Sequence, residues 1–495
     1  MVTKTKSLFF IFSLSSFLIG QIASLAQGNN PRYSKEIEDK IHEVENNLSG
    51  WVQVEGEPNH WSLADRMKYH HNYGLSIAVV HNYKIEWARG YGLADSAENR
   101  PVTIETLFQA ASISKSLNGV GVLKLVQEKK INLDEDVNHY LMSWKLPASD
   151  SAKGKKITVY NLLNHTAGLN VHGFPGYSTT DTLPSVIQIL DGKKPANTVA
   201  IRSVFEPGLR SEYSGGGITI SQLIITDVTG RAYDEFEWNE VLKPLGMTNS
   251  SYTQPPPGNR KELLATAYYP NKMEVKGKYH IYPEMAAAGL WTNPTDLCHY
   301  IIETQLAYEG KSSKVLSQSM TKTRLTPFPG TNAALGVFVD SIGDRKYFQH
   351  GGANEGFRCQ YYGSLTGGDG VVVMVNSDDG SINRELINSV AAVYGWKDFS
   401  KPQIKKLANV PSDTLDKYVG EYVAQGEPQL LVSKNGNDLY LSIFDRDPMR
   451  MYFTSHADFF LMDIQAQLGF ARNEKDGHYM VVAKGNNHDT QWIRK

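Results

Sequence analysis

The chain has 495 residues, more than one ordinary domain usually holds, with 41% hydrophobic and 21% charged side chains. This composition predicts well-filled globular cores and excludes global disorder. A formal net charge of −2, with lysines and arginines scattered along the chain, excludes the basic footprint of a protein that binds nucleic acid or an anionic membrane.

The first residues have the pattern of a secretory signal peptide. Two lysines precede an apolar run over 7–20, and small residues that a signal peptidase needs follow at 23–26. We expect cleavage after Ala26, with 1–26 as the signal peptide, and no later run approaches about 18 continuous apolar residues. The mature protein is therefore expected in the periplasm or secreted, without a membrane span. A retained N-terminal anchor is the alternative.

Hydrophobic periodicity predicts an α+β domain over 34–399. The elements expected before residue 131 are helices at 33–48, 63–70 and 112–130 and strands at 74–80 and 84–92. The elements expected after it are helices at 157–164, 218–229, 295–306 and 381–394 and strands at 334–341, 346–350, 357–363 and 370–376. Strands at both ends, with a mostly helical region between them, predict one antiparallel sheet flanked by helices.

Composition changes after Tyr394. A polar stretch with two prolines over 400–413 is interpreted as a linker. Short apolar runs separated by Asn-Gly and Asp-Gly turn signals then predict a small all-β barrel or sandwich over 414–495. The runs expected to form strands are 430–432, 439–443, 451–453, 459–462 and 479–483.

Cysteine usage gives no framework of disulfides. The chain has only Cys298 and Cys359, both in apolar surroundings, so buried free thiols are expected and a single bridge is the alternative. Neither residue has a Cys or His at metal-ligand spacing. We therefore expect no metal site and no cofactor.

Ser112-Ile113-Ser114-Lys115 opens one of the predicted helices, and its spacing puts Ser112 and Lys115 on one face, one turn apart. An amine beside a hydroxyl can take its proton, which a weak alcohol nucleophile needs. The unpaired N–H groups of a helix start can also stabilise an oxyanion. We interpret Ser112 as a nucleophile on an exposed helix turn; a solvated helix face is the alternative.

Two later loops add candidates. A Pro-Gly turn leads to Tyr213, whose phenolate could act as a general base beside an ammonium group. In His350-Gly351-Gly352-Ala353, the glycines would let a substrate backbone come close, and the next N–H could face an oxyanion. The alternatives are an ordinary half-buried tyrosine and a strand end with a bulge.

Taken in order, the motifs resemble the serine β-lactamase and penicillin-binding-protein superfamily over roughly 34–395. The nearest branch contains class C β-lactamases, D-alanyl-D-alanine carboxypeptidases, D-aminopeptidases and small-ester esterases. The motifs are Ser-x-x-Lys at 112–115, Leu-Leu-Asn-His-Thr-Ala-Gly-Leu at 162–169, Tyr-Ser at 213–214, Pro-Leu-Gly-Met at 244–247, Gly-Leu-Trp-Thr-x-Pro-x-Asp at 289–296 and His-x-Gly at 350–352. The C-terminal β domain resembles the lipocalin-like appendage of some relatives.

The resemblance implies roles for single residues. It makes Ser112 the acylated nucleophile, Lys115 its proton partner and Tyr213 the base that works with Lys115. The N–H groups of Ser112 and Ala353 become the oxyanion hole. His350, in the His-x-Gly motif that ends at Gly352, stands where many relatives carry the lysine of Lys-Thr-Gly.

Two departures from the family pattern bear on the substrate. Gly215 stands where relatives usually carry an asparagine that holds the substrate's amide. His350 removes a permanent positive charge at neutral pH, which Arg358 could partly replace. Both changes argue against efficient β-lactam hydrolysis.

The sequence therefore predicts an exported serine hydrolase that acts through an acyl-enzyme on small esters or D-amino-acid peptides and amides. A β-lactamase or a D-alanyl-D-alanine carboxypeptidase is one alternative. A non-catalytic binding or sensing module of the same fold is the other. The expected partner is a small-molecule or peptide substrate, and the oligomeric state is left open.

Overall fold

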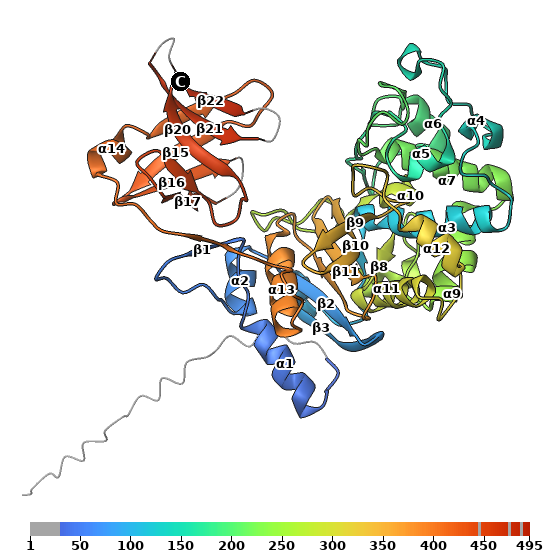
Figure 1. Cartoon of the computed structure of the whole chain (residues 1–495), viewed down its shortest axis with the longest axis horizontal. Helices are drawn as coiled ribbons and strands as arrows, with labels where there is room; N and C mark the ends of the chain where they lie inside the picture. The colour runs from blue at the N-terminus through green and yellow to red at the C-terminus, as the bar shows by residue number, and fades with distance from the viewer. Residues whose placement is uncertain (1–29, 444–446, 474–476, 486–488) are drawn as a thin grey trace, which may run out of the picture.

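The computed structural model describes residues 30–443, 447–473, 477–485 and 489–495. The expected signal peptide lies outside these residues. A main domain combines a sheet with a large helical region, and a separate β domain follows near the C-terminus (Figure 1).

The central sheet joins the two ends of the main domain. Within the described residues it has seven strands in the order β4-β3-β2-β12-β11-β10-β9. Their bounds are β2 Gly74–His81, β3 Lys84–Asp95, β4 Arg100–Pro101, β9 Phe338–Ile342, β10 Arg345–Asn354, β11 Phe357–Ser364 and β12 Gly370–Val375. The N-terminal strand β2 pairs with the C-terminal strand β12 in antiparallel register, with Ala78 opposite Val372. The predicted α+β architecture with an antiparallel sheet is confirmed.

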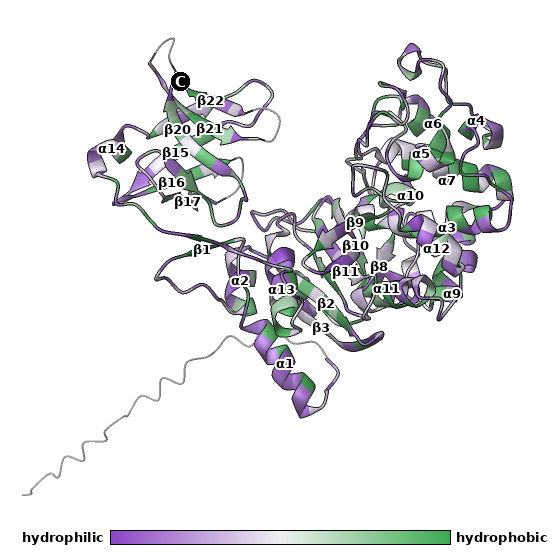
Figure 2. Ribbon diagram, in the orientation of Figure 1, coloured by the Kyte–Doolittle hydropathy of each residue, from purple (hydrophilic) through white to green (hydrophobic). Residues whose placement is uncertain are grey.

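Alternation along the strands divides the main domain into two hydrophobic cores. On β12, Val371 and Val373 belong to the core under α1 (Lys35–Glu45) and α13 (Ser381–Val393). Val372, between them, belongs to the core on the opposite face, under the helical region. Helix α1 has hydrophobic residues next to hydrophilic ones along its length (Figure 2), as expected of a helix with one face on the sheet.

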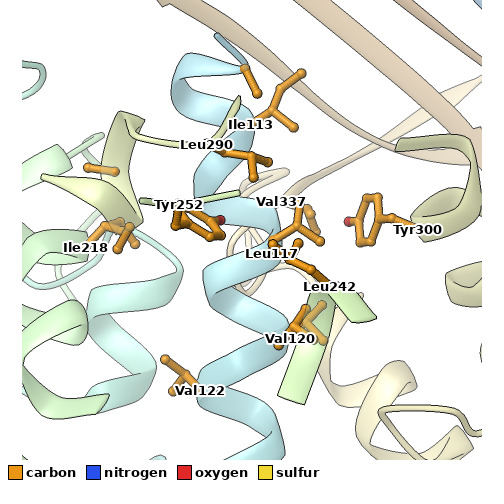
Figure 3. Close-up of a cluster of buried hydrophobic side chains, with 14 of the residues drawn as sticks. Ile113, Leu117, Val120, Val122, Ile218, Leu242, Tyr252, Leu290, Tyr300 and Val337 are labelled. Atoms are coloured by element: carbon orange, nitrogen blue, oxygen red, sulfur yellow. The ribbon is translucent and has the colours of Figure 1, made fainter. Parts of the chain in front are cut away.

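Helix α3 (Ser114–Gln127) runs through the middle of the larger core and begins directly after the 3₁₀ turn that carries Ser112. Its side chains Leu117 and Val120 pack among residues from several distant segments, including Tyr252 and Leu290 (Figure 3). A helix that is buried on most sides is held by its whole surroundings, so its first turn is a rigid support.

The remaining helices of the main domain lie around α3 and the sheet (Figure 1). Their bounds are α2 Leu63–Tyr69, α4 Val137–Tyr140, α5 Val159–Leu163, α6 Val186–Asp191, α7 Gly215–Thr229, α8 Tyr233–Glu237, α9 Lys243–Leu245, α10 Met285–Ala288, α11 Pro294–Tyr308 and α12 Gln318–Arg324. Short strand pairs join β5 (Phe108–Gln109) to β8 (Trp291–Thr292) and β6 (Tyr177–Ser178) to β7 (His280–Ile281).

The C-terminal domain is a nearly closed, barrel-like sheet. Its described part has nine strands in the order β17-β16-β15-β14-β22-β21-β20-β19-β18, preceded by α14 (Ser412–Asp416). Aromatic residues fill its core; for example, Tyr418 stacks on Phe470 with ring centroids 3.9 Å apart. The strands are β14 Gly420–Val423, β15 Leu430–Asn435, β16 Asp438–Ile443, β17 Met449–Arg450, β18 Tyr452–Phe453, β19 Asp458–Phe460, β20 Gln467–Arg472, β21 Tyr479–Lys484 and β22 Thr490–Arg494.

Several predicted boundaries differ from the structure. The strand expected at 334–341 begins only at Phe338, and the helix expected from Ile218 already begins at Gly215, because the Ser214 hydroxyl caps it. Strands β14, β17, β20 and β22 of the β domain and the short strands β4 to β8 of the main domain were not predicted. Within the stretch interpreted as a linker, Gln403–Lys405 forms β13, which pairs in parallel with β1 (Val52–Val54).

Two further expectations concern cysteines and membranes. Cys298 and Cys359 are both buried and free, as predicted. No helix of the described chain is long and apolar enough to cross a bilayer.

Removal of residues 415–495 should leave a folded main domain that self-associates. The deletion takes away Phe460, which covers the buried side chains of Val52 and Val54. We expect native-like circular dichroism together with self-association, seen as a larger mass in size-exclusion chromatography with light scattering. The control is the same truncation with Val52→Thr and Val54→Thr, which should elute at a smaller mass. Equal masses for the two truncations would contradict the prediction.

Candidate active site

Ser112 lies on a 3₁₀ turn (Ala111–Ile113) between β5 and α3. The preceding residue, Ala111, has φ of 48°, in the left-handed region that costs a non-glycine residue about 1 kcal/mol. Neighbouring elements hold this turn, because the Ala110 N–H donates to the Leu290 carbonyl at 2.8 Å and the Cys359 thiol to the Ala110 carbonyl at 3.1 Å. The position of Ser112 is therefore determined by the surrounding fold.

Lys115 lies against Ser112, and its side chain is buried. Its Nζ lies 3.0 Å from the Ser112 Oγ and donates to the Ala287 carbonyl at 2.6 Å. The residue is 2% exposed, so the prediction that it lies on an exposed helix turn is wrong. Burial lowers the pKa of Lys115 to about 7, because the charged form loses its hydration. Near neutral pH a large share of the amine is uncharged and able to accept a proton.

Tyr213 lies beside the same amine. The Lys115 Nζ is 5.1 Å from the centroid of the Tyr213 ring. Burial raises the pKa of Tyr213 above its ordinary value, and a hydrogen bond with Ser112 acts in the opposite direction without cancelling the effect of burial. The phenol is therefore neutral near pH 7.

His165 holds the other side of Tyr213. Its ring centroid is 4.5 Å from that of Tyr213, and its Nδ1 accepts the Ser214 N–H at 3.3 Å. Burial, followed by the charge of Lys115, keeps the pKa of His165 well below its usual range. The motif at 162–169 marked this residue only as part of a family pattern, and no feature of the sequence placed it against the tyrosine.

Strand β10 brings Gly352 and Ala353 to the nucleophile turn. A Cβ on Gly352 would lie 2.3 Å from the Ala110 carbonyl oxygen, so only glycine permits this approach. Ala353, the next residue, is exposed and lines the same cleft as Ser112. The structure thus brings together the two residues whose N–H groups were predicted to form an oxyanion hole.

His350 lies on β10 before Gly352 and Ala353 and is 3% exposed. Its Nδ1 is 2.6 Å from the Gly351 carbonyl, so the proton sits on this nitrogen. Burial and then the charge of Lys115 lower the pKa of His350 to about 3. The imidazole is neutral, and it cannot supply the fixed cation of a lysine.

These groups open onto a cleft of about 550 Å³. Its lining comes from the nucleophile turn, the loop before α7, β9 to β11 and the start of α13. The lining residues are Ser112, Tyr213, Phe338, Gln349, His350, Gly351, Gly352, Ala353, Arg358, Cys359, Gln360, Gly380, Asn383 and Arg384.

Residues 62–393 match the family model described as Beta-lactamase. The chain belongs to the β-lactamase family. Protein flp of Staphylococcus aureus strain N315 is 27% identical over 354 residues, covering 70% of this chain and 67% of that protein.

Two solved structures share the fold of this family member. The octameric penicillin-binding protein homologue from Pyrococcus abyssi matches with a TM-score of 0.62 and 20% identity, covering 87% of this chain and 98% of that one. The D-amino acid amidase from Ochrobactrum anthropi SV3 matches with a TM-score of 0.56 and 21% identity, covering 73% and 98%. At these identities the likeness concerns the fold.

Gly215 departs from the family pattern for a reason visible in the structure. A Cβ at this position would lie 3.0 Å from both the His172 carbonyl oxygen and an edge carbon of the Phe174 ring. The segment that carries these groups is fixed on α7 by the Gly215 N–H, which donates to the His172 carbonyl at 3.1 Å. A carbonyl oxygen and an aromatic ring therefore crowd the place where the side chain of an asparagine would begin.

Arg358 supplies less free charge than the sequence suggested. Its guanidinium pairs with Asp378 at 2.7 Å and donates to the carbonyls of Asn354 and Phe357. Arg384, at the first turn of α13, is exposed and lines the cleft. The cationic side of this family member's cleft therefore lies on α13.

Glu284 is a buried carboxyl group that sequence analysis missed. Neither of its carboxylate oxygens has a hydrogen-bond partner among the described residues, and burial raises its pKa to about 8. It precedes α10, whose Ala287 carbonyl binds the Lys115 amine. Largely protonated at neutral pH, it brings little charge to the site. No local pattern marks it, because its burial comes from the tertiary fold.

One group of side chains in the described residues has the types and spacing for a metal ion, namely His70, Glu385 and Asp463. The guanidinium of Arg66 already occupies its centre, within 2.5 Å of Glu385 and 3.4 Å of Asp463. This group therefore forms an ion-pair network around an arginine and offers no space for a cation.

Proposed function

We propose that this protein is a serine hydrolase that forms an acyl-enzyme on Ser112 and cleaves small esters or D-amino-acid peptides and amides. The observation that carries the proposal is the Lys115 amine, 3.0 Å from the Ser112 hydroxyl in a buried setting that brings its pKa to about 7. A base with a pKa near the working pH is well matched to proton transfer.

Acylation begins when the neutral Lys115 amine takes the Ser112 proton while Oγ bonds to the substrate carbonyl carbon. The carbonyl electron pair moves to oxygen, which the N–H groups of Ser112 and Ala353 stabilise. When this pair returns, the bond to the leaving group breaks. The Tyr213 hydroxyl protonates the departing oxygen or nitrogen and regains a proton from the Lys115 ammonium.

Deacylation reverses these transfers with water in place of the leaving group. Tyr213 passes its hydroxyl proton to the neutral Lys115 amine as it takes the proton of the attacking water. Hydroxide adds to the acyl carbon, and the Ser112 oxygen departs with the proton that the Lys115 ammonium returns. Tyr213 acts here as a neutral proton carrier, because burial makes a standing phenolate costly. The sequence assigned the base to Tyr213 with Lys115; the pKa directions favour the amine of Lys115 as the acceptor.

The substrate class follows from what the cleft lacks. Phe174 fills the space beside Gly215, and the neutral His350 offers no cation. Short esters and small D-aminoacyl groups need neither the amide contact nor the fixed charge. A D-amino acid amidase shares the fold, which is consistent with this choice. β-Lactamase or D-alanyl-D-alanine carboxypeptidase activity is the alternative, favoured by the exposed Arg384 in the cleft.

The test is intact mass after treatment with a fluorophosphonate, followed by a panel of short nitrophenyl esters, D-aminoacyl anilides and nitrocefin. A stable adduct that is absent in Ser112→Ala, with turnover of esters or anilides, supports the proposal. Absence of any adduct would support a non-catalytic binding module instead.

Export is part of the same proposal and rests on the sequence of residues 1–26. The mature protein recovered from the periplasm or the culture medium should begin at Gln27. N-terminal sequencing of the full product checks this, and a protein that keeps residues 1–26 would contradict it.

The pH profile of the reaction should follow the Lys115 amine. Because the uncharged amine accepts the proton, kcat/KM should rise with pH, with a midpoint near 7, and level off above it. A stopped-assay series between pH 5 and 9 on a neutral ester measures the midpoint. A rate that stays constant from pH 5 to 9 would contradict Lys115 as the base.

Gly215→Asn should restore little amide recognition unless Phe174 is also shortened. The asparagine Cβ would be 3.0 Å from the Phe174 ring, so the single variant is strained. With Phe174→Ala added, the ratio of nitrocefin to short-ester kcat/KM should rise by up to about tenfold, since a hydrogen bond between neutral groups is worth about 0.5–1.5 kcal/mol. Phe174→Ala alone is the control. An equal ratio in Gly215→Asn and in the double variant would show that Phe174 is not the obstacle.

A further inference from the structure

The C-terminal β domain contacts the main domain through a buried ionic network at α2 and α13. Arg66 donates two hydrogen bonds to Glu385, at 2.7 and 2.5 Å, and its guanidinium lies 3.4 Å from Asp463 of the β domain. Tyr69 donates its hydroxyl to Asp463 at 2.7 Å. The three charged side chains are each no more than 10% exposed. Charges buried to this extent depend on one another for pairing.

His70 extends the network to the chain just before α13. Its Nε2 lies 3.1 Å from Glu385 and its Nδ1 3.4 Å from Asp379. Burial opposes the charge of this imidazole, but the bonds to Asp379 and Glu385 outweigh burial and raise the pKa of His70 to about 9. Two cations, Arg66 and His70, are therefore balanced against three carboxylates, one of which the β domain supplies.

The same short stretch of chain lines the cleft. Gly380, Asn383 and Arg384 border the cleft, while Asp379 and Glu385 belong to the network. These residues lie in the first turn of α13 or in the chain just before it. A movement of the network residues therefore also moves the residues that border the cleft.

We propose that Asp463 is a positioning residue for the substrate cleft, acting through Arg66 and Glu385 on the first turn of α13. The proposal rests on the proposed function in that the cleft is taken to bind substrate. Its effect falls on the part of an anionic substrate that reaches Arg384, and it leaves the acyl transfer at Ser112 unchanged.

The β domain is also docked by contacts that do not involve Asp463. Strand β1 pairs with β13, and Val52 and Val54 pack against Phe460. The Trp51 and Phe460 rings meet edge to face with centroids 6.3 Å apart. A variant at Asp463 should therefore fold and stay docked, so that its effect on α13 can be measured.

The experiment compares Asp463→Ala with Asp447→Asn in the full chain. Asp447 pairs with His71 at 3.3 Å across the same interface but is 78% exposed, so it is the matched control. Amide hydrogen exchange over 381–386 should become about tenfold faster in Asp463→Ala and stay unchanged in Asp447→Asn. Asp463→Glu, which keeps the carboxylate, should restore slow exchange in this turn.

Kinetics supply the second measurement. In Asp463→Ala, the KM of a carboxylate-bearing ester should rise about fivefold or more, while its kcat stays within about twofold of wild type. Both kcat and KM of a neutral ester should also stay within about twofold of wild type. The rate of fluorophosphonate labelling at Ser112 should not change.

Unchanged exchange in α13 would overturn the inference, whatever the activity. Equal losses for both esters, or faster exchange throughout the β domain, would also overturn it, because they indicate general destabilisation. If wild-type protein hydrolyses no ester or anilide and forms no adduct, the proposed function fails, and hydrogen exchange by itself still decides whether Asp463 positions α13.

Discussion

Ser112→Ala and Lys115→Met should each lower kcat/KM by about a thousandfold or more while the protein stays folded. Ser112 carries the oxygen that attacks, and the Lys115 Nζ, 3.0 Å away, receives its proton. Groups that act as one unit are strongly non-additive, so the double variant should be little worse than either single one. Steady-state kinetics on a short ester and fluorophosphonate labelling measure these effects.

The lysine variant has a second, opposite signature in stability. Burial lowers the pKa of Lys115 to about 7, against an ordinary 10.5, so between these values the unfolded chain binds more protons. Below pH 7 the folded state bears the full cost of the buried charge. Lys115→Met, of similar length, should therefore unfold at higher denaturant concentration at pH 6 than wild type.

Lys124→Met on the same helix is the control for both measurements. Lys124 is partly exposed and pairs with Glu128 at 3.3 Å, so its loss should alter neither activity nor stability by much. Near wild-type turnover in Ser112→Ala or in Lys115→Met on every hydrolysed substrate would remove the substituted residue from the mechanism.

Local pattern was enough to predict the sheet and the central helix. The alternation of Val371, Val372 and Val373 appears in the sequence as a continuous apolar run, and the structure divides it between two cores. The meeting of N- and C-terminal strands in one antiparallel sheet was predicted too, whereas the order of the strands within that sheet was not. Boundaries were less certain where a cap or a tight approach decides them, as at Gly215.

The site was predicted as a set of residue types, and its electrostatics were not. Spacing brought Ser112 and Lys115 together, but the low pKa of the amine comes from the packing of distant segments around α3. His165 and Phe174 belong to loops far from Tyr213 and Gly215 in the sequence. Such contacts depend on tertiary structure, which no local window contains.

The junction with the β domain shows the same limit. The stretch around Gln403–Lys405 has the composition of a linker, yet it pairs with β1, more than 340 residues earlier in the chain. Asp463 likewise follows a strand of the β domain without any local mark of its contact with Arg66. Composition indicates which structure a segment favours in isolation. Whether that segment pairs as a strand depends on which other strand the fold places beside it.

Tyr213→Phe should lower kcat by about a hundred- to ten-thousandfold with little change in fold, because only the hydroxyl is removed. The ring would keep its contact with His165, whose centroid is 4.5 Å away. Without the hydroxyl, no group carries a proton between Lys115 and the leaving group. Tyr268→Phe, which loses two hydrogen bonds with Ser96 outside the cleft, one donated to its hydroxyl and one accepted from its N–H, is the matched control and should keep wild-type turnover.

The leaving group gives this prediction its sharpest form. A nitrophenolate departs without protonation, whereas an amine must be protonated before it leaves, so Tyr213→Phe should impair D-aminoacyl amides more than nitrophenyl esters. Measuring both substrates in the variant and in wild type separates a proton carrier from a residue that only shapes the cleft. Equal losses in kcat/KM, which reports acylation and not the deacylation step that both substrates share, would assign Tyr213 to binding, and a loss below threefold on both would leave Lys115 as the only proton-transfer group that the reaction requires.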